Sequence, residues 1–122
     1  HVNCLGVLNG TEKWHYYRKA WCFCLPSYAE GFPIVLLEAM AAGTPIVSSQ
    51  AGGIPDMMVH AQNGYLLKPG DVRGIAASID KLWRDPEQRG EMAKINQQRV
   101  KNRYTMARCA DKISQLYQEL LH

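Results

Sequence analysis

The sequence contains no lysine or arginine from Ala20 through Leu67, although its 122 residues carry 14 basic side chains against 11 acidic ones and a net charge of +3. The basic residues gather in the second half, mostly in stretches with a helical pattern. A solvated helix face explains that distribution more simply than a binding patch. We therefore expect no nucleic-acid partner.

Long apolar runs and metal-type cysteine spacings are also missing. Glu38 interrupts the longest apolar candidate, so no segment is long enough to cross a bilayer. The four cysteines are Cys4, Cys22, Cys24 and Cys109, and no pair has the two-residue gap of a zinc knuckle or a thiol redox motif. Cys22 and Cys24 would share one face of a strand as small hydrophobic side chains, which favours a reducing compartment.

The beginning of the chain lacks the marks of a complete protein. It opens on His1 with no Met, and no basic segment precedes an apolar run, so no signal peptide is visible. A composition of 47% apolar and 20% charged residues fits one globular domain. We expect residues 1–122 to form a single domain of a longer cytoplasmic protein, and we leave membrane association through the missing part open.

Short apolar runs alternate with helical patterns in the first half of the chain. The expected strands are Val2–Leu5, Cys22–Leu25, Pro45–Ser48 and Gly64–Leu67, and the expected helices are Thr11–Ala20, a segment from Pro33 to just before Gly43, and Pro55–Val59. Such alternation predicts a parallel sheet flanked by helices.

From Asp71 onward only helices are expected. The second of them should open at Asp85-Pro86-Glu87-Gln88, which supplies a cap, a proline and a capping-box glutamine. The apolar stripes of the first and third helices are Ile75, Ile79, Leu82 and Trp83, and Cys109, Ile113, Leu116, Tyr117 and Leu120. We expect these faces to form scaffold and core rather than ligand contacts.

Two glutamates, Glu30 and Glu38, stand eight positions apart around a predicted helix start. Gly31 permits a sharp turn, and Pro33 suits the first helical position. The free N–H groups of that first turn and the positive end of the helix dipole favour a phosphate. At roughly 1.5 Å per residue, Glu38 lies up to about 12 Å further along, which is comparable to the length of a nucleotide sugar. Because each carboxylate can accept from two vicinal hydroxyls, the pair predicts a site that holds two ends of one such ligand.

Each part of this motif also has a purely structural interpretation. Without the surrounding motif, Glu30 would be interpreted as an acidic residue at a helix terminus that the helix dipole stabilises. Glu38 stands among apolar neighbours, where an unpaired carboxylate is costly, so it is either at a cleft or paired, and we favour the cleft. Gly52 and Gly53 serve either a tight turn or the close approach of a ligand.

The run from Pro26 to Gly64 resembles the C-terminal domain of GT-B glycosyltransferases, and within them the retaining group called family 4. The matching features are the two glutamates separated by seven residues, the small residues and Gly43-Thr44-Pro45 turn that follow, Gly52-Gly53-Ile54-Pro55, and Asn63-Gly64-Tyr65-Leu66-Leu67. The resemblance implies an α/β fold: a Rossmann-like parallel sheet flanked by helices, the C-terminal half of a GT-B fold, ending in an all-helical segment. It also implies a hexosyltransferase-type enzyme that moves a sugar from a nucleotide diphosphate sugar to an acceptor hydroxyl with retention.

The same resemblance assigns roles to individual residues. Glu30 would meet the sugar as the catalytic residue, Glu38 would hold the ribose, and the Gly6-Val7 loop would border the base. The full donor-binding set is Gly6, Val7, Gly31, Phe32, Pro33, Ile34, Leu37 and Glu38. No metal and no cofactor are expected.

Parts of the family's site have no counterpart in this sequence. An Arg and a Lys in the opening strand and loop of the family's domain balance the diphosphate, and no matching pair occurs here. We therefore expect the first strand and the N-terminal acceptor domain, which would bind a glycan, lipid or small molecule, to lie outside the chain. The isolated chain should be inactive.

Three other functions stay open. A glycosidase needs carboxylates about 5 to 5.5 Å or about 6.5 to 9.5 Å apart, and helical spacing suggests more. A non-catalytic nucleotide-sugar binding module or a degenerate transferase domain would keep the site without an acceptor domain. A sugar-nucleotide epimerase of the same architecture would need further acid/base residues, which we do not find. The base, sugar, acceptor, linkage and oligomeric state are not specified.

Overall fold

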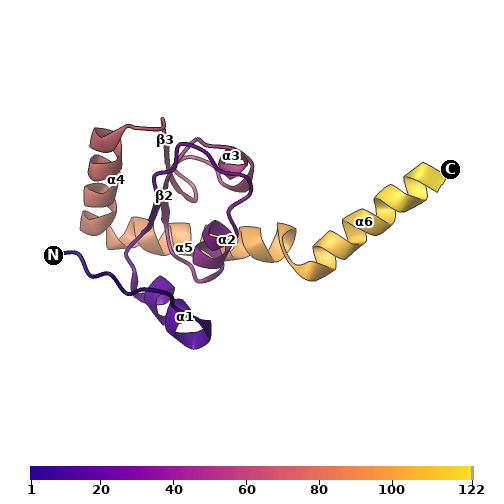
Figure 1. Cartoon of the computed structure of the whole chain (residues 1–122), viewed down its shortest axis with the longest axis horizontal. Coiled ribbons are helices and arrows are strands. Elements are labelled where there is room, and N and C mark those ends of the chain that lie inside the picture. The colour runs from indigo at the N-terminus through magenta and orange to yellow at the C-terminus, as the bar shows by residue number, and fades with distance from the viewer. Residues whose placement is uncertain (122) are drawn as a thin grey trace.

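A three-stranded parallel sheet with helices on both faces forms the centre of the molecule, as the computed structural model shows (Figure 1). The structure describes residues 1–121. The elements in chain order are α1 (Gly10–Lys19), β1 (Phe23–Leu25), α2 (Ile34–Ala41), β2 (Ile46–Ser49), α3 (Ile54–Met57), β3 (Gly64–Leu67), α4 (Val72–Arg84), α5 (Pro86–Arg103) and α6 (Met106–Leu121). The predicted α/β fold with a parallel sheet is confirmed.

The strands follow the chain in space, in the order β1-β2-β3. Phe23 pairs with Ile46, and Ile46 pairs with Gly64 in the next ladder. The expected strand Val2–Leu5 is wrong, since residues 1–9 hold no strand and Val2 and Leu5 are exposed. Extended backbone becomes a strand only when a neighbour takes its N–H and C=O groups, and the described sheet gives this segment none.

Helix α2 ends where its sequence predicts. Gly43 adopts φ +83°, its N–H donates to Met40 O at 3.0 Å, and the N–H of Thr44 donates to Ala39 O at 2.9 Å. These two bonds form a Schellman motif, which satisfies the last carbonyls of the helix and turns the chain toward β2.

The two faces of the sheet bury separate apolar clusters because successive residues of a strand point to opposite sides. Ile46 of β2 packs with Leu36 and Met40 of α2, whereas the next residue, Val47, packs with Leu82 of α4. Helices α2 and α4 therefore cover opposite faces.

Helix α5 lies across the amino ends of β2 and β3. The fully buried amide of Asn96 donates to Thr44 O (2.9 Å) and Asn63 O (3.0 Å), just ahead of those two strands. Its Oδ1 accepts from Asn63 Nδ2 at 2.8 Å, and Asn63 Oδ1 accepts from Val59 N–H at 2.7 Å. This buried amide network fixes α5 at the edge of the sheet opposite the carboxyl ends of the strands.

The predicted start of α5 is confirmed. Asp85 is the N-cap, and its carboxylate accepts from Gln88 N–H at 2.9 Å. The side chain of Gln88 does not complete a capping box; its Oε1 accepts from Tyr65 Oη at 2.8 Å.

Two tryptophans stack outside the core. The rings of Trp21, before β1, and Trp83, on α4, lie 6.2 Å apart at an interplanar angle of 27°, and both are about half exposed. The guanidinium of Arg89 lies 5.6 Å from the Trp21 ring. The apolar stripe of α4 is therefore only partly core, because Leu82 is fully buried while Trp83 reaches the surface.

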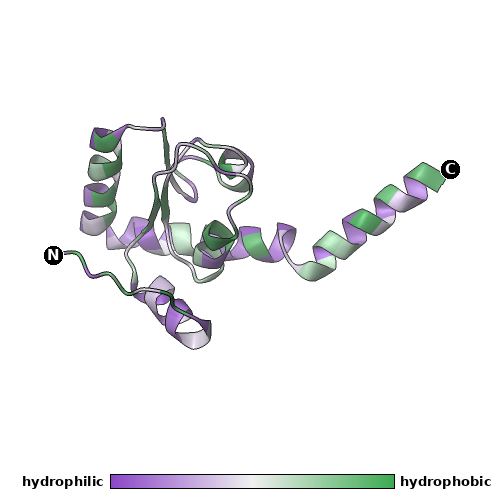
Figure 2. Ribbon diagram, in the orientation of Figure 1, coloured by the Kyte–Doolittle hydropathy of each residue, from purple (hydrophilic) through white to green (hydrophobic). Residues whose placement is uncertain are grey.

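Helix α6 projects away from the rest of the molecule (Figure 1), and apolar and polar patches alternate along it (Figure 2). None of its residues is buried, and Ile113, Leu116, Tyr117 and Leu120 are all more than half exposed. The expectation that this stripe forms core is wrong for the described chain. Within residues 1–121, no helix combines the length and apolar character needed to span a bilayer.

Candidate functional site

The loops that follow β1 and β2 are bound together at the carboxyl edge of the sheet. Ser48 Oγ donates to Leu25 O at 2.9 Å, and Ser49 Oγ donates to Ser27 O. The motif that begins at Pro26 therefore starts on the same edge as the Gly52-Gly53 turn. In parallel α/β sheets this edge is where ligands bind.

The backbone of the Gly52-Gly53 turn contacts the backbone of the loop that carries Glu30. Gly53 N–H donates to Gly31 O at 2.8 Å. Gly52 has φ +52°, and a Cβ there would overlap the carbonyl oxygen of Glu30; a Cβ at Gly53 would lie 2.7 Å from Gly31 O. Both glycines are thus required by close approach of backbone to backbone. Of the two interpretations of this pair, the structure supports the structural one.

Glu30 is half-buried at this edge. Its Oε1 accepts from Ser27 Oγ at 2.5 Å. Ser27 therefore orients one carboxylate oxygen of Glu30 next to the start of α2.

The N-terminus of α2 offers its first N–H groups without a side-chain cap. Buried Pro33 is the N-cap, so the helix begins one residue later than its sequence indicates, and the side chains of Phe32, Ile34 and Val35 around it are exposed. Leu37 instead packs against the first apolar cluster. The Leu36 N–H donates to Pro33 O at 3.1 Å, so the groups left without a cap are the N–H groups of Ile34 and Val35. Such a helix start suits an anionic group.

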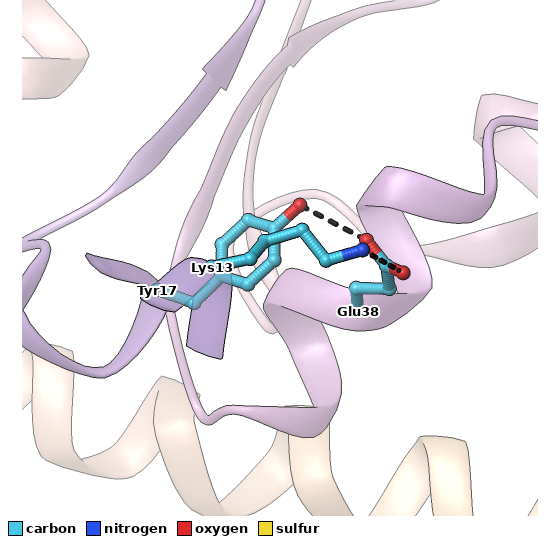
Figure 3. A network of polar contacts seen from close by, with 3 residues as sticks. All are labelled: Lys13, Tyr17 and Glu38. Carbon is cyan, nitrogen blue, oxygen red and sulfur yellow. Dashed lines mark hydrogen bonds and ion pairs between the residues drawn. The ribbon is translucent and has the colours of Figure 1, made fainter. Parts of the chain in front are cut away.

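Glu38 lies one turn further along α2 and is paired. Figure 3 shows Lys13 and Tyr17 of α1 reaching its carboxylate: Lys13 Nζ lies 2.7 Å from Oε1, and Tyr17 Oη donates to Oε2 at 3.1 Å. The Glu38 side chain remains 23% exposed. Of the two alternatives for this residue, a cleft or a partner, the structure therefore shows the partner.

Lys13 and Tyr17 were missed by reasoning from sequence. Their spacing of four residues places them on one face of α1, and an acid among apolar residues calls for a partner, but the pairing across 25 positions is a tertiary contact. Burial first, and the hydrogen bond and charge of Glu38 next, raise the pKa of Tyr17 from 10.0 to about 12. The phenol is therefore a hydrogen-bond donor at neutral pH.

Gly6 and Val7 lie in the exposed segment ahead of α1. Gly6 has φ +67°, and nothing approaches within 4 Å of a Cβ built there. No hydrogen bond within residues 1–121 links them to the Glu30 loop, so their contact with a base stays a prediction.

The candidate site lies on the carboxyl edge of the sheet, apart from the hollow between α5 and α6. A hollow of about 730 Å³ lies between α5 and α6, and neither glutamate lines it. Residues 1–121 bring together no group of three or more His, Cys, Asp or Glu side chains that could hold a metal ion. The expectation of a metal-free site stays a prediction.

Solved structures share the fold of this chain. Sucrose-phosphate synthase from Thermosynechococcus elongatus superposes with a TM-score of 0.79 and 33% identity over 87% of this chain and 27% of its own. The C-terminal domain of a glycosyl transferase group 1 protein from Francisella tularensis gives 0.74 and 29% over 84% of this chain and 53% of its own. The fold is that of the GT-B glycosyltransferases.

The sequence matches the family described as glycosyl transferases group 1 over residues 1–99. Glycogen synthase from Mycobacterium tuberculosis is 34% identical over 113 residues, which cover 93% of this chain and 27% of that protein. N-acetyl-alpha-D-glucosaminyl L-malate synthase from Bacillus anthracis is 33% identical over 97 residues, 80% of this chain and 26% of that protein. The chain belongs to the glycosyl transferases group 1 family, and it spans about a quarter of the length of these relatives.

Proposed function

We propose that this chain is the donor-binding part of a retaining, family 4-type glycosyltransferase, which moves a sugar from a nucleotide diphosphate sugar to an acceptor hydroxyl. The observation that carries the proposal is the carboxyl edge itself, where the Glu30 loop lies on Gly52-Gly53 beside the uncapped start of α2. HepE of Anabaena, 25% identical with a TM-score of 0.79 over 85% of this chain and 29% of its own, has been solved with UDP and also with UDP-glucose.

The proposed roles follow the order of groups along the edge. The N–H groups at the start of α2 bind the diphosphate, and Glu30, oriented by Ser27, contacts the sugar and stabilises the positive charge that develops on it. Glu38 accepts from the ribose hydroxyls, and the Gly6-Val7 segment borders the base. No metal takes part. The helix start stabilises the negative charge of the departing nucleotide together with cations from outside the chain.

The acceptor belongs to a part of the protein outside residues 1–122. A glycan, lipid or small molecule would bind on an N-terminal domain that faces the open edge, and transfer requires both domains. We place the enzyme in the cytoplasm, and any attachment to a membrane would come from that other part.

An amide NMR titration of the chain with UDP, GDP, ADP and their sugar conjugates tests the donor site. We expect shifts at Gly31 to Glu38 and at Gly52, strongest for one base. Glu38→Gln should weaken nucleotide binding. The control Glu12→Gln, which neutralises an exposed carboxylate on α1, should not weaken it. If the chain is folded and none of its amide shifts changes with any of the ligands, the proposed donor site in this chain is ruled out.

Glu30 has a separate test because its role concerns the sugar. Glu30→Gln should lower the preference for a nucleotide sugar over the bare nucleotide. If the affinities for both ligands fall by the same factor, Glu30 does not contact the sugar.

A further inference from the structure

The Glu38 carboxylate receives one donor on each oxygen, and both donors come from α1. Lys13 binds Oε1 and Tyr17 binds Oε2, at 2.7 and 3.1 Å (Figure 3). Two donors on different oxygens fix the plane of the carboxylate, which a single donor would leave free to rotate.

The arrangement leaves acceptor capacity for a ligand. An ionised carboxylate has about four lone-pair positions on its two oxygens. Lys13 and Tyr17 occupy one position on each, so each oxygen keeps one. Two acceptor positions in one fixed plane suit two neighbouring hydroxyl groups.

The second donor, Tyr17, is itself held in place. Thr44 Oγ1 donates to Tyr17 O at 2.6 Å, and the Tyr17 ring packs edge-on against Phe23 of β1 with the centroids 5.6 Å apart. Tyr17 is thus fixed both by the turn after α2 and by the sheet. Its hydroxyl therefore has a defined position relative to Glu38.

Lys13 also supplies a charge that the adjoining sequence lacks. No Lys or Arg occurs from Ala20 through Leu67, and the Lys13 side chain is only 34% exposed. Its ammonium compensates Glu38, which would otherwise add to the negative charge of a diphosphate bound at the start of α2.

We infer that Lys13 and Tyr17 are positioning residues that orient Glu38 to recognise a ribose carrying both its 2′ and 3′ hydroxyls. The inference rests on the proposed function and adds a selectivity to it: ribonucleotides bind in preference to 2′-deoxyribonucleotides, and α1 sets that preference without touching the nucleotide.

A ligand-free measurement tests the network. In the 122-residue chain, ¹³Cζ-tyrosine NMR should show Tyr17 titrating well above its ordinary pKa, and Glu38→Gln should bring the pKa down. A Tyr17 that titrates near 10.0 in the unchanged chain would overturn the inference whatever the chain binds.

Binding of UDP and 2′-deoxy-UDP, or of the pair whose base the chain prefers, tests the selectivity. The unchanged chain should prefer the ribonucleotide, and Tyr17→Phe and Lys13→Met should each reduce that ratio by roughly tenfold, since each removes a bond to a charged group. Tyr16→Phe and Lys19→Met, on the exposed side of the same helix, should leave it unchanged, and Lys13→Arg should preserve most of it.

The outcomes separate the two proposals. No binding of either nucleotide by the folded, unchanged chain would overturn the donor site and the inference together. Binding without a preference, or a preference that survives in Tyr17→Phe and Lys13→Met, would overturn the inference and leave the donor site standing. A preference lost only in those two variants would support both.

Discussion

An added methyl group has opposite consequences at Gly52 and Gly90. Gly52 has φ +52°, and a Cβ there would overlap the backbone oxygen of Glu30. Gly90 lies inside α5 with nothing within 4 Å of the added atom. The first glycine is required by a contact, whereas the second weakens its helix.

We predict that Gly52→Ala lowers the free energy of unfolding by about 2 to 3 kcal/mol, because both the backbone conformation and the contact with the Glu30 loop must change. Gly90→Ala should raise it by up to about 1 kcal/mol through helix propensity. Urea denaturation measures both, and amide shifts at residues 27–31 should move only in the first variant. If the two substitutions changed the free energy of unfolding by the same amount, the Glu30 loop would not contact Gly52 in solution.

The protonation of a single residue, Tyr17, makes the stability of the fold depend on pH. Its pKa is raised to about 12, so the folded chain keeps the proton that the unfolded chain releases near pH 10. Its contribution to stability is present below pH 10 and is lost as the pH rises toward 12. Unfolding free energies measured from pH 9 to 12 should therefore fall less steeply in Tyr17→Phe than in the unchanged chain; parallel curves would contradict the assignment.

At the scale of elements, the buried amide of Asn96 holds α5 against the ends of two strands. We predict that Asn96→Ala costs about 3 kcal/mol, because it leaves Asn63 and the Thr44 carbonyl buried without their partners. Gln98→Ala on the exposed side of the same helix breaks only a bond to Asn102 and should change stability by less than about 0.5 kcal/mol.

The urea midpoints of Asn96→Ala and Gln98→Ala show whether the buried amide network holds α5 against the sheet. A small loss in Asn96→Ala would mean that water or a rearranged Asn63 satisfies the freed groups. In that case α5 would be held by its apolar contacts, such as Met92, rather than by the amide network.

The sequence predicts correctly those helix ends whose capping residues and hydrogen-bond partners lie within a few positions of one another. Gly43 marks a helix end and Asp85 a helix start, because capping is decided by neighbours in the chain. Val2–Leu5 has a strand pattern but no strand partner. The candidate site shows the same limit: the position of Glu30 could be predicted from its motif, but the pairing of Glu38 with Lys13 and Tyr17 could not, since it depends on how α1 packs on α2.

At the scale of the whole molecule, α6 is an appendage to the described fold. It buries no residue, although its pattern is strongly amphipathic (Figure 2). An apolar stripe in a sequence shows that a helix has an apolar face and does not show what that face contacts.

We predict that removing residues 106–122 changes the free energy of unfolding of the remainder by less than about 0.5 kcal/mol, since no side chain of residues 106–121 is buried. Far-ultraviolet circular dichroism should fall by the helical signal of α6 while the urea midpoint stays constant. A large drop in the midpoint would show that α6 packs onto the body of the chain in solution.

The stacked indoles of Trp21 and Trp83 give the molecule an internal optical probe. Two indole rings 6.2 Å apart, with planes inclined at 27°, couple their electronic transitions, so they should produce a circular dichroism band that neither ring has alone. One ring lies two residues ahead of β1, and the other lies on α4, which follows β3 in the chain and packs against β2 and β3. The band will vanish when these two segments separate, so the assembly of the sheet can be followed without a label and independently of the helix signal.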